Sequence, residues 1–322
     1  MPGEMKAICF SCGLLMLAAV SGTLADAPDL KAVRRPMSDL HALAKIAVPG
    51  SPDWVAIGAS IWISNNPKNN VSNIDPKTNT IVATIPVGKS PCAGLAIGFG
   101  SVWVPNCGDG SVWRLDLQTH QRVAAIITGV ADTEGGIAAG EGSVWMPSDK
   151  AGILSRIDPK TNQVVSKIKI ASGSFTAVEG ESAIWVTSTK NNLVSRVDPK
   201  SEKVVASIPV GLSPRFLTVG LGSVWVLNQG DGSVSRIVPA SNRVVATIAV
   251  GVPGAGGDIA TGDGSVWVTA IGTPLSRIDP ATNRVVKQYI GKGGDALRFG
   301  VGSIWLSNHE MQEVWRIDPK GL

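Results

Sequence analysis

A tryptophan recurs seven times in the same local frame, and this repeat constrains the fold more than any other feature of the sequence. The intervals are 38 to 42 residues, and the positions are Trp62, Trp103, Trp145, Trp185, Trp225, Trp267 and Trp305. A second marker, Arg-Ile-Asp or a close variant, follows each tryptophan. A period of about forty residues is typical of solenoids, propellers and repeat arrays.

Each copy contains the pattern of four short strands. In the sixth copy we expect strands over 258–262, 265–270, 275–279 and 284–290. A Gly-x-Gly turn joins the first two, where glycine adopts positive φ at little cost. An Asp-Pro-x-Thr-Asn loop joins the last two, and its residues favour tight turns. No copy keeps an apolar period of 3.6 residues, which excludes helical repeats, so the unit is predicted to be a propeller blade.

The two ends of the chain predict how the ring closes. The last copy stops at 316–322 and has no fourth strand, whereas residues 41–48 resemble the fourth strands of the other copies. Pairing these two segments would remove two exposed sheet edges. We therefore expect an all-β fold, a seven-bladed β-propeller over 41–322 with four-stranded blades, closed by an N-terminal strand that completes the last blade.

The N-terminus has the pattern of a secretory signal peptide. Lys6 precedes an apolar stretch over 7–20 and the small-residue segment SGTLA, so cleavage is expected after Ala25. This stretch is too short to span a bilayer as a helix, although a retained anchor is the competing interpretation. We expect a signal peptide over 1–25, a flexible lead-in over 26–40, and a periplasmic or secreted protein without a membrane span in the mature chain.

Charge and cysteine content limit the partners and the compartment. The formal net charge is +4, but no run of five or more Lys or Arg occurs, which argues against nucleic acid as a partner. We expect a monomer. Cys92 precedes the first strand of the second blade and Cys107 follows its second strand. Antiparallel pairing brings these positions together, so we expect a disulfide; two free thiols or a metal site are the alternatives.

The blade sequence resembles a known repeat. The combination VWVTx…GSVSRIDPxTNxVVATIPVG resembles the bacterial YVTN-type propeller repeats and, more distantly, those of virginiamycin B lyase (streptogramin lyase), over about residues 41–322. Likeness to the lyases implies elimination across an ester linkage, assisted by a magnesium ion and by His and Glu on one face.

Candidate site residues are those that depart from the repeat. The first halves of the innermost strands approach the channel mouth, where propellers usually bind ligands. The chain varies there at Asp53, Trp54, Glu134, Phe175, Arg215, Phe216, Asp258 and Asp295, and Arg298 follows further along its strand. We expect Arg298 to pair with Asp258 or Asp295, because an unpaired buried arginine is costly. His309 is expected on this rim and His120 on the opposite one.

Two interpretations of these residues stay open. In one, Arg215 and Arg298 hold an anionic or carbonyl group, with acids beside it and Trp54, Phe175 and Phe216 as an apolar wall. In the other, the charges form a solvated ring of ion pairs that fills the channel. The recurrent arginine before the Ile-Asp of six copies belongs to the scaffold instead.

Three functions fit the sequence. The first is an exported propeller that binds a small molecule or protein partner at the channel mouth, without catalytic machinery or a required cofactor. The alternative is a metal-assisted lyase or a lactonase-like hydrolase. It would use His309 or Glu134 as base and Asp258, Asp295 and Glu134 to hold Mg²⁺ or Ca²⁺. The third is an envelope scaffold that acts through protein contacts.

Overall fold

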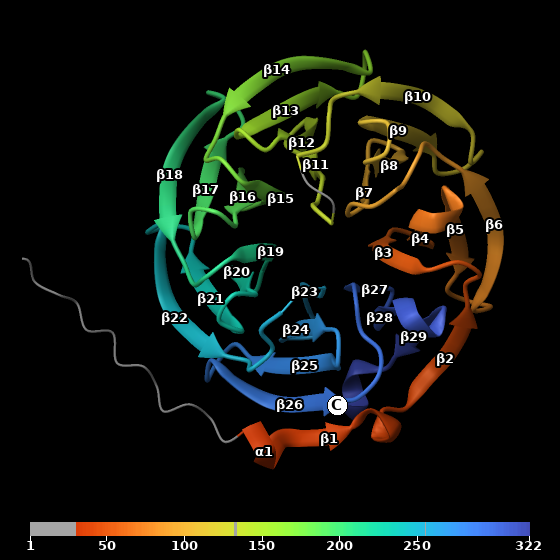
Figure 1. Ribbon diagram of the computed structural model, residues 1–322, viewed down its shortest axis with the longest axis vertical. Coiled ribbons are helices and arrows are strands. Elements are labelled where there is room, and N and C mark those ends of the chain that lie inside the picture. The colour runs from red at the N-terminus through yellow and green to blue at the C-terminus, as the bar shows by residue number, and fades with distance from the viewer. Residues whose placement is uncertain (1–29, 132–133, 255) are drawn as a thin grey trace, which may run out of the picture.

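The computed structural model describes residues 30–131, 134–254 and 256–322. The expected signal peptide and its cleavage point therefore lie outside the described residues. Seven blades are arranged in a ring, as Figure 1 shows; each has four antiparallel strands, and the sheet of one blade has a fifth strand at its edge. This confirms the all-β, seven-bladed propeller. No helix among the described residues is long and apolar enough to cross a membrane.

Within each blade the strands run outward from the channel in chain order. The innermost strands are β3 (Pro52–Ile57), β7 (Ala96–Gly98), β11 (Ala138–Gly140), β15 (Ser174–Gly180), β19 (Pro214–Gly220), β23 (Asp258–Gly262) and β27 (Leu297–Gly300). The second strands, which carry the repeated tryptophans, are β4 (Ile61–Asn65), β8 (Ser101–Asn106), β12 (Ser143–Asp149), β16 (Ala183–Ser188), β20 (Ser223–Asn228), β24 (Ser265–Ala270) and β28 (Ser303–Asn308).

The outer half of each blade is more exposed. The third strands are β5 (Asn70–Asp75), β9 (Ser111–Asp116), β13 (Ile153–Asp158), β17 (Leu193–Asp198), β21 (Ser233–Val238), β25 (Thr273–Asp279) and β29 (Glu313–Ile317). The outermost strands are β6 (Thr80–Pro86), β10 (Arg122–Ile127), β14 (Gln163–Lys169), β18 (Lys203–Pro209), β22 (Arg243–Ala249), β26 (Arg284–Ile290) and β2 (Ala42–Ala47). In blade 6 only the third strand differs from the expected bounds, beginning two residues earlier, at Thr273.

The ring closes as the sequence predicts. Strand β2 pairs antiparallel with β29, from Ala42 opposite Ile317 to Ala47 opposite Glu313. The N-terminal strand thus becomes the outermost strand of blade 7. Closure gives that blade the same four strands as the others and leaves no incomplete sheet at the chain ends.

The lead-in differs from the expected flexible segment from residue 30 onward. Helix α1 (Leu30–Val33) leads into β1 (Arg34–Pro36), which pairs in parallel with β26 as a fifth strand of blade 6. The 3₁₀ turn η1 (Met37–Asp39) follows, and Met37 and Leu40 are buried. Arg34 also donates to the Gln288 side chain (2.8 Å). Gln288 of blade 6 stands at the position of Thr247 in blade 5. The sequence analysis did not recognise this residue as the docking point of the lead-in.

The repeated tryptophans form the contacts between blades. All seven are fully buried, and each packs with apolar side chains of its own and the following blade. A buried tryptophan removes a large apolar area from water. The repeated tryptophans therefore hold neighbouring blades together, which confirms their assignment to the scaffold.

Two faces of the ring are named here by their loops. The upper rim carries the loops between second and third strands and the connections from one blade to the next. These include the 3₁₀ turns η2 (Asn66–Lys68) and η3 (His309–Met311). The lower rim carries the turns between first and second strands and between third and fourth strands, and the terminal turn η4 (Pro319–Gly321).

Candidate functional site

A pocket of about 430 Å³ opens on the upper rim at the mouth of the channel. Its wall comes from blades 6, 7, 1, 2 and 3, and each contribution is an innermost strand start or an upper-rim loop. The lining residues are Asp53, Asn66, Ser90, Cys92, Glu134, Gly256, Ile271, Gly294, Asp295, His309 and Glu310. Four of these are carboxylic acids, and His309 is the one basic side chain among them.

Asp53 and Asp295 form a carboxyl pair at the junction of blades 1 and 7. Burial raises the pKa of Asp53 well above its usual value, and the nearby acids Asp295 and Glu134 raise it further. Burial, followed by the charges of Glu134 and Asp258, raises the pKa of Asp295 to about 7. The hydrogen bond between them opposes this rise at Asp295 and adds to the rise at Asp53. Two carboxyl groups at such short range cannot both ionise cheaply.

Glu134 faces the pair from the opposite wall and is tied to Arg215. The guanidinium donates to a Glu134 carboxylate oxygen (2.7 Å) and to Gln229 Oε1 (3.0 Å). It also lies over the rings of Phe175 (4.4 Å) and Phe216 (5.4 Å). Each terminal nitrogen of Arg215 thus donates to a protein acceptor.

Arg298 is paired as expected, and the structure selects between its two candidate partners. Its guanidinium donates to the carboxylate of Asp258, which is 1% exposed and also accepts from the backbone N–H of Ile259 and Leu297. Burial raises the pKa of Asp258, and the charge of Arg298 opposes that rise. Asp295 is not the partner. This ion pair joins the inner strands of blades 6 and 7, and Arg298 also lines a second pocket of about 220 Å³ along the inner strands.

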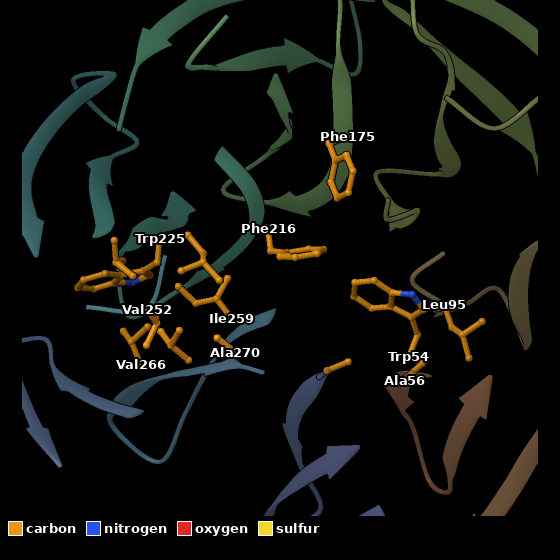
Figure 2. Close-up of a cluster of buried hydrophobic side chains, with 14 of the residues drawn as sticks. Trp54, Ala56, Leu95, Phe175, Phe216, Trp225, Val252, Ile259, Val266 and Ala270 are labelled. Atoms are coloured by element: carbon orange, nitrogen blue, oxygen red, sulfur yellow. The ribbon is translucent and has the colours of Figure 1, made fainter. Parts of the chain in front are cut away.

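The three aromatic residues close the channel beneath the pocket. Trp54, Phe175 and Phe216 project toward the ring centre from β3, β15 and β19, as Figure 2 shows. Phe216 packs against both other rings, with centroids 5.3 Å from Trp54 and 5.5 Å from Phe175. All three are at most 4% exposed. They act as a buried plug under the pocket, so the expected apolar wall facing a ligand is not formed.

His309 lies on the upper rim, as its position after β28 predicts. Its Nδ1 is 3.9 Å from Asp295 Oδ2, and its side chain is 45% exposed. A histidine at this distance can exchange a proton with Asp295 after a small movement. His120 lies on the opposite rim against Trp62 and does not contribute to the pocket.

The disulfide between Cys92 and Cys107 is present, and it confirms the predicted pairing. Cys92 also lines the pocket, and its carbonyl accepts the backbone N–H of Glu134 (2.7 Å). Nearby, Gly94 donates to the carbonyl of Gly135 (2.6 Å). The bridge therefore fixes the segment that positions Glu134 in the pocket wall.

The acids do not form a metal centre. Within the described ranges, no three His, Cys, Asp or Glu side chains converge as a metal ion requires. Asp258 is engaged by Arg298, and Asp53 is hydrogen-bonded to Asp295. The donor set therefore does not fit the Mg²⁺ or Ca²⁺ site that the lyase alternative needs, since both ions need several converging oxygen ligands.

Several pocket residues escaped the sequence argument. Asn66, Ser90 and Glu310 belong to upper-rim loops, and Gln229, which orients Arg215, follows β20. We aligned the innermost strands only, and these residues lie in the loops after the second strands and in the connection between blades. A comparison of the seven upper-rim loops could have found them, because Gln229 and Glu310 have no counterparts in most copies.

Comparison with solved structures agrees with the fold. A streptogramin B lyase superposes with a TM-score of 0.73 at 16% identity, covering 85% of this chain and 96% of the lyase. The virginiamycin B lyase of Staphylococcus aureus gives 0.73 at 17% identity, covering 85% and 98%. Hydrazine synthase from Kuenenia stuttgartiensis gives 0.70 at 16% identity, covering 84% and 96%.

Sequence comparisons give no closer relative. No family model matches the chain, and no curated protein matches it. The resemblance to YVTN-type repeats therefore stays a prediction. The structural likeness shows a seven-bladed propeller fold shared with virginiamycin B lyase.

Proposed function

We propose that this chain is an exported, non-catalytic propeller that binds a small organic cation in the upper-rim pocket. The observation that carries the proposal is the position of Asp53. Its side chain lines the pocket, the residue is 8% exposed, and its hydrogen-bonding neighbour is a second carboxyl group. Across the described residues, no basic side chain and no N–H group hydrogen-bonds to it. A cation in the pocket would supply the missing partner.

The charges around the pocket favour a cation over an anion. Arg215 is held by Glu134 and Gln229, and Arg298 is held by Asp258. Each guanidinium already has a carboxylate partner, which favours a cationic ligand over an anionic one. The pocket volume suits a small molecule more than a folded partner, and the aromatic plug blocks passage through the channel.

Export is supported by two features. Residues 1–25 have the signal-peptide pattern, and a structural disulfide persists in oxidising compartments. We accordingly place the mature protein in the periplasm or outside the cell. The Cys92–Cys107 bridge then has a role at the site, because the carbonyl of Cys92 accepts the backbone N–H of Glu134.

Thermal melting with matched probes tests the binding proposal. n-Butylammonium, n-butanol and butyrate share a chain but differ in charge. We expect only n-butylammonium to raise the melting temperature, because a ligand stabilises the folded state that binds it. Asp53→Asn should abolish the shift. Asp263→Asn makes the same change in an exposed lower-rim turn and should leave it intact. A rise in melting temperature with butyrate would refute a cation site. So would a rise with n-butylammonium in Asp53→Asn that equals the rise in wild type.

A second candidate is the metal-assisted lyase or a lactonase-like hydrolase. The proximity of His309 to Asp295 favours it, because a proton-transferring base is what elimination across an ester requires. It predicts that Mg²⁺ or Ca²⁺, added after EDTA treatment, raises the melting temperature and enables cleavage of an ester or lactone. It also predicts that His309→Ala abolishes that cleavage.

A further inference from the structure

A recurrent contact, here called the arginine clamp, joins successive blades at the lower rim. In blade 4, Arg196 lies over the ring of Trp185 (5.1 Å) and donates to the next blade, to the carbonyl of Pro239 (2.8 Å) and to Asn242 Oδ1 (2.9 Å). The clamp combines a cation–π contact with charge-assisted hydrogen bonds across the seam.

Six of the seven seams have such a clamp. The arginines are Arg114, Arg156, Arg196, Arg236, Arg277 and Arg316, each over the tryptophan of its own blade. Four reach the proline carbonyl and asparagine of the next blade's lower-rim loop. Arg156 instead reaches Glu202, and Arg277 reaches the carbonyl of Leu322.

The seam between blades 1 and 2 has no arginine clamp. Asn73 occupies the arginine position, and its side chain donates to Ser60 within its own blade (2.9 Å). His120 occupies the position of the accepting asparagine. Its ring meets Trp62 edge-on, with centroids 5.4 Å apart. The cation, its stacking contact and its hydrogen bonds across the seam are therefore all missing at this one place.

The tryptophan of this seam has lost a second interaction. The other six repeated tryptophans donate their indole N–H to the glycine carbonyl that ends the innermost strand, at 2.9–3.3 Å. The indole N–H of Trp62 is buried without an acceptor. The turn before Trp62 is one residue shorter, with Gly58 and Ser60 in place of Gly98 and Ser101, which displaces the carbonyl. An unsatisfied buried N–H costs about 1–3 kcal/mol.

The upper rim of the same seam is firmly held. Ser90, in the connection between the two blades, donates its N–H to Asn69 Oδ1 (2.7 Å) and its hydroxyl to Asn66 Oδ1 (2.6 Å). The disulfide then anchors the next turn of chain to blade 2. On the outside of the seam, a groove of about 470 Å³ lies between the blades, lined by Ile85, His120 and neighbouring residues. At this seam the upper rim thus has hydrogen bonds to the connection between the blades, whereas the lower rim lacks the arginine clamp.

We propose that the ring opens at the seam between blades 1 and 2, with the lower rim separating first and the upper rim acting as the hinge. Local opening occurs where the fewest interactions must break. Asp53 of blade 1 and Cys92 of blade 2 both line the rim pocket, so the hinge lies beside the pocket. The proposal does not depend on which ligand the pocket binds.

Hydroxyl-radical labelling read by mass spectrometry tests the proposal with internal controls. The seven repeated tryptophans are equivalent and fully buried in the closed ring, so oxidation of each reports the opening of its own seam. We expect Trp62 to be oxidised about tenfold faster than the other six, which corresponds to one lost buried hydrogen-bonding group. Equal rates at all seven positions would overturn the proposal.

Two variants make the test reciprocal. Asn73→Arg with His120→Asn restores the residues of a clamp beside Ser60, and it should slow Trp62 oxidation. Arg236→Asn with Asn283→His removes the clamp between blades 5 and 6 and should speed the oxidation of Trp225. Fast labelling of Trp62 that persists in the first variant, or unchanged labelling of Trp225 in the second, would contradict the role of the clamp.

Discussion

The two rims of the propeller treat charge in opposite ways. At the lower rim, the repeated arginines each find acceptors in the next blade and a tryptophan beneath them. At the upper rim, Asp53, Asp295 and Glu134 face one another across a pocket, and a single arginine, Arg215, neutralises one of them. The lower rim therefore stabilises the ring, while the upper rim stores unfavourable carboxyl contacts that a ligand can relieve.

The largest expected effect comes from removing one of the buried scaffold tryptophans. Trp225→Ala removes a fully buried ring between blades 5 and 6. It should lower the free energy of unfolding by about 3–5 kcal/mol, because the site cannot collapse to fill the cavity. Urea titration followed by circular dichroism measures this. Asp53→Asn, at the upper rim, should not destabilise, and a comparable loss there would erase the distinction between the rims.

Removing the disulfide should also destabilise the fold. Cys92→Ser with Cys107→Ser opens a link between residues 15 apart in sequence. Loop-closure entropy for a loop of this size predicts a loss of about 3 kcal/mol. The same urea titration checks it. Because Cys92 also accepts the backbone N–H of Glu134, we expect the affinity for n-butylammonium to fall as well. An unchanged affinity would mean that the bridge does not contribute to the site.

The carboxyl pair predicts a particular pH dependence. Asp295 has a pKa of about 7 in the folded protein, above the value near 4 of an unfolded chain. Between these values the folded state binds more protons, so the contribution of Asp295 to stability falls as pH rises from about 4 to about 7. Wild type should lose about 3–4 kcal/mol relative to Asp295→Asn over that window, as measured by urea titration at each pH. A constant difference would exclude the raised pKa.

The smallest expected effect tests whether Arg215 pairs only with Glu134 or also contacts the ligand. Arg215→Met frees Glu134 and makes the pocket more negative, so n-butylammonium should bind about threefold more tightly by calorimetry. Lys89→Met, on an exposed upper-rim lysine outside the pocket lining, provides a control for net charge. Weaker binding in Arg215→Met would mean that the guanidinium contacts the ligand itself.

The fold was predictable from sequence because every blade repeats the same local solution. The tryptophan frame, the Gly-x-Gly turns and the missing last strand determined blade number, strand order and closure. The docking of residues 30–40 was not predictable, since it depends on Gln288, a single departure in blade 6. Turn chemistry and apolar alternation carry no signal for such a contact.

The site was predictable only as a group of positions. Alignment of the seven copies placed Asp53, Glu134 and Asp295 at strand starts near the channel mouth, and it suggested Asp258 or Asp295 as the partner of Arg298. The alignment could not show how deeply each side chain is buried. Trp54, Phe175 and Phe216 occupy equivalent strand starts but fold inward as a plug, while the acids remain at the pocket wall. Rotamers and contacts across the channel decide this, and neither is encoded in the repeat.

Calorimetric titration of the protein with n-butylammonium at pH 7, repeated in buffers of different ionisation enthalpy, tests the central claim most directly. A cation beside the Asp53–Asp295 pair favours its ionised form, so binding should release a fraction of one proton to the buffer. In Asp295→Asn this release should be smaller. Binding with no proton exchange in wild type, or equal release in Asp295→Asn, would contradict a cation site built on the carboxyl pair.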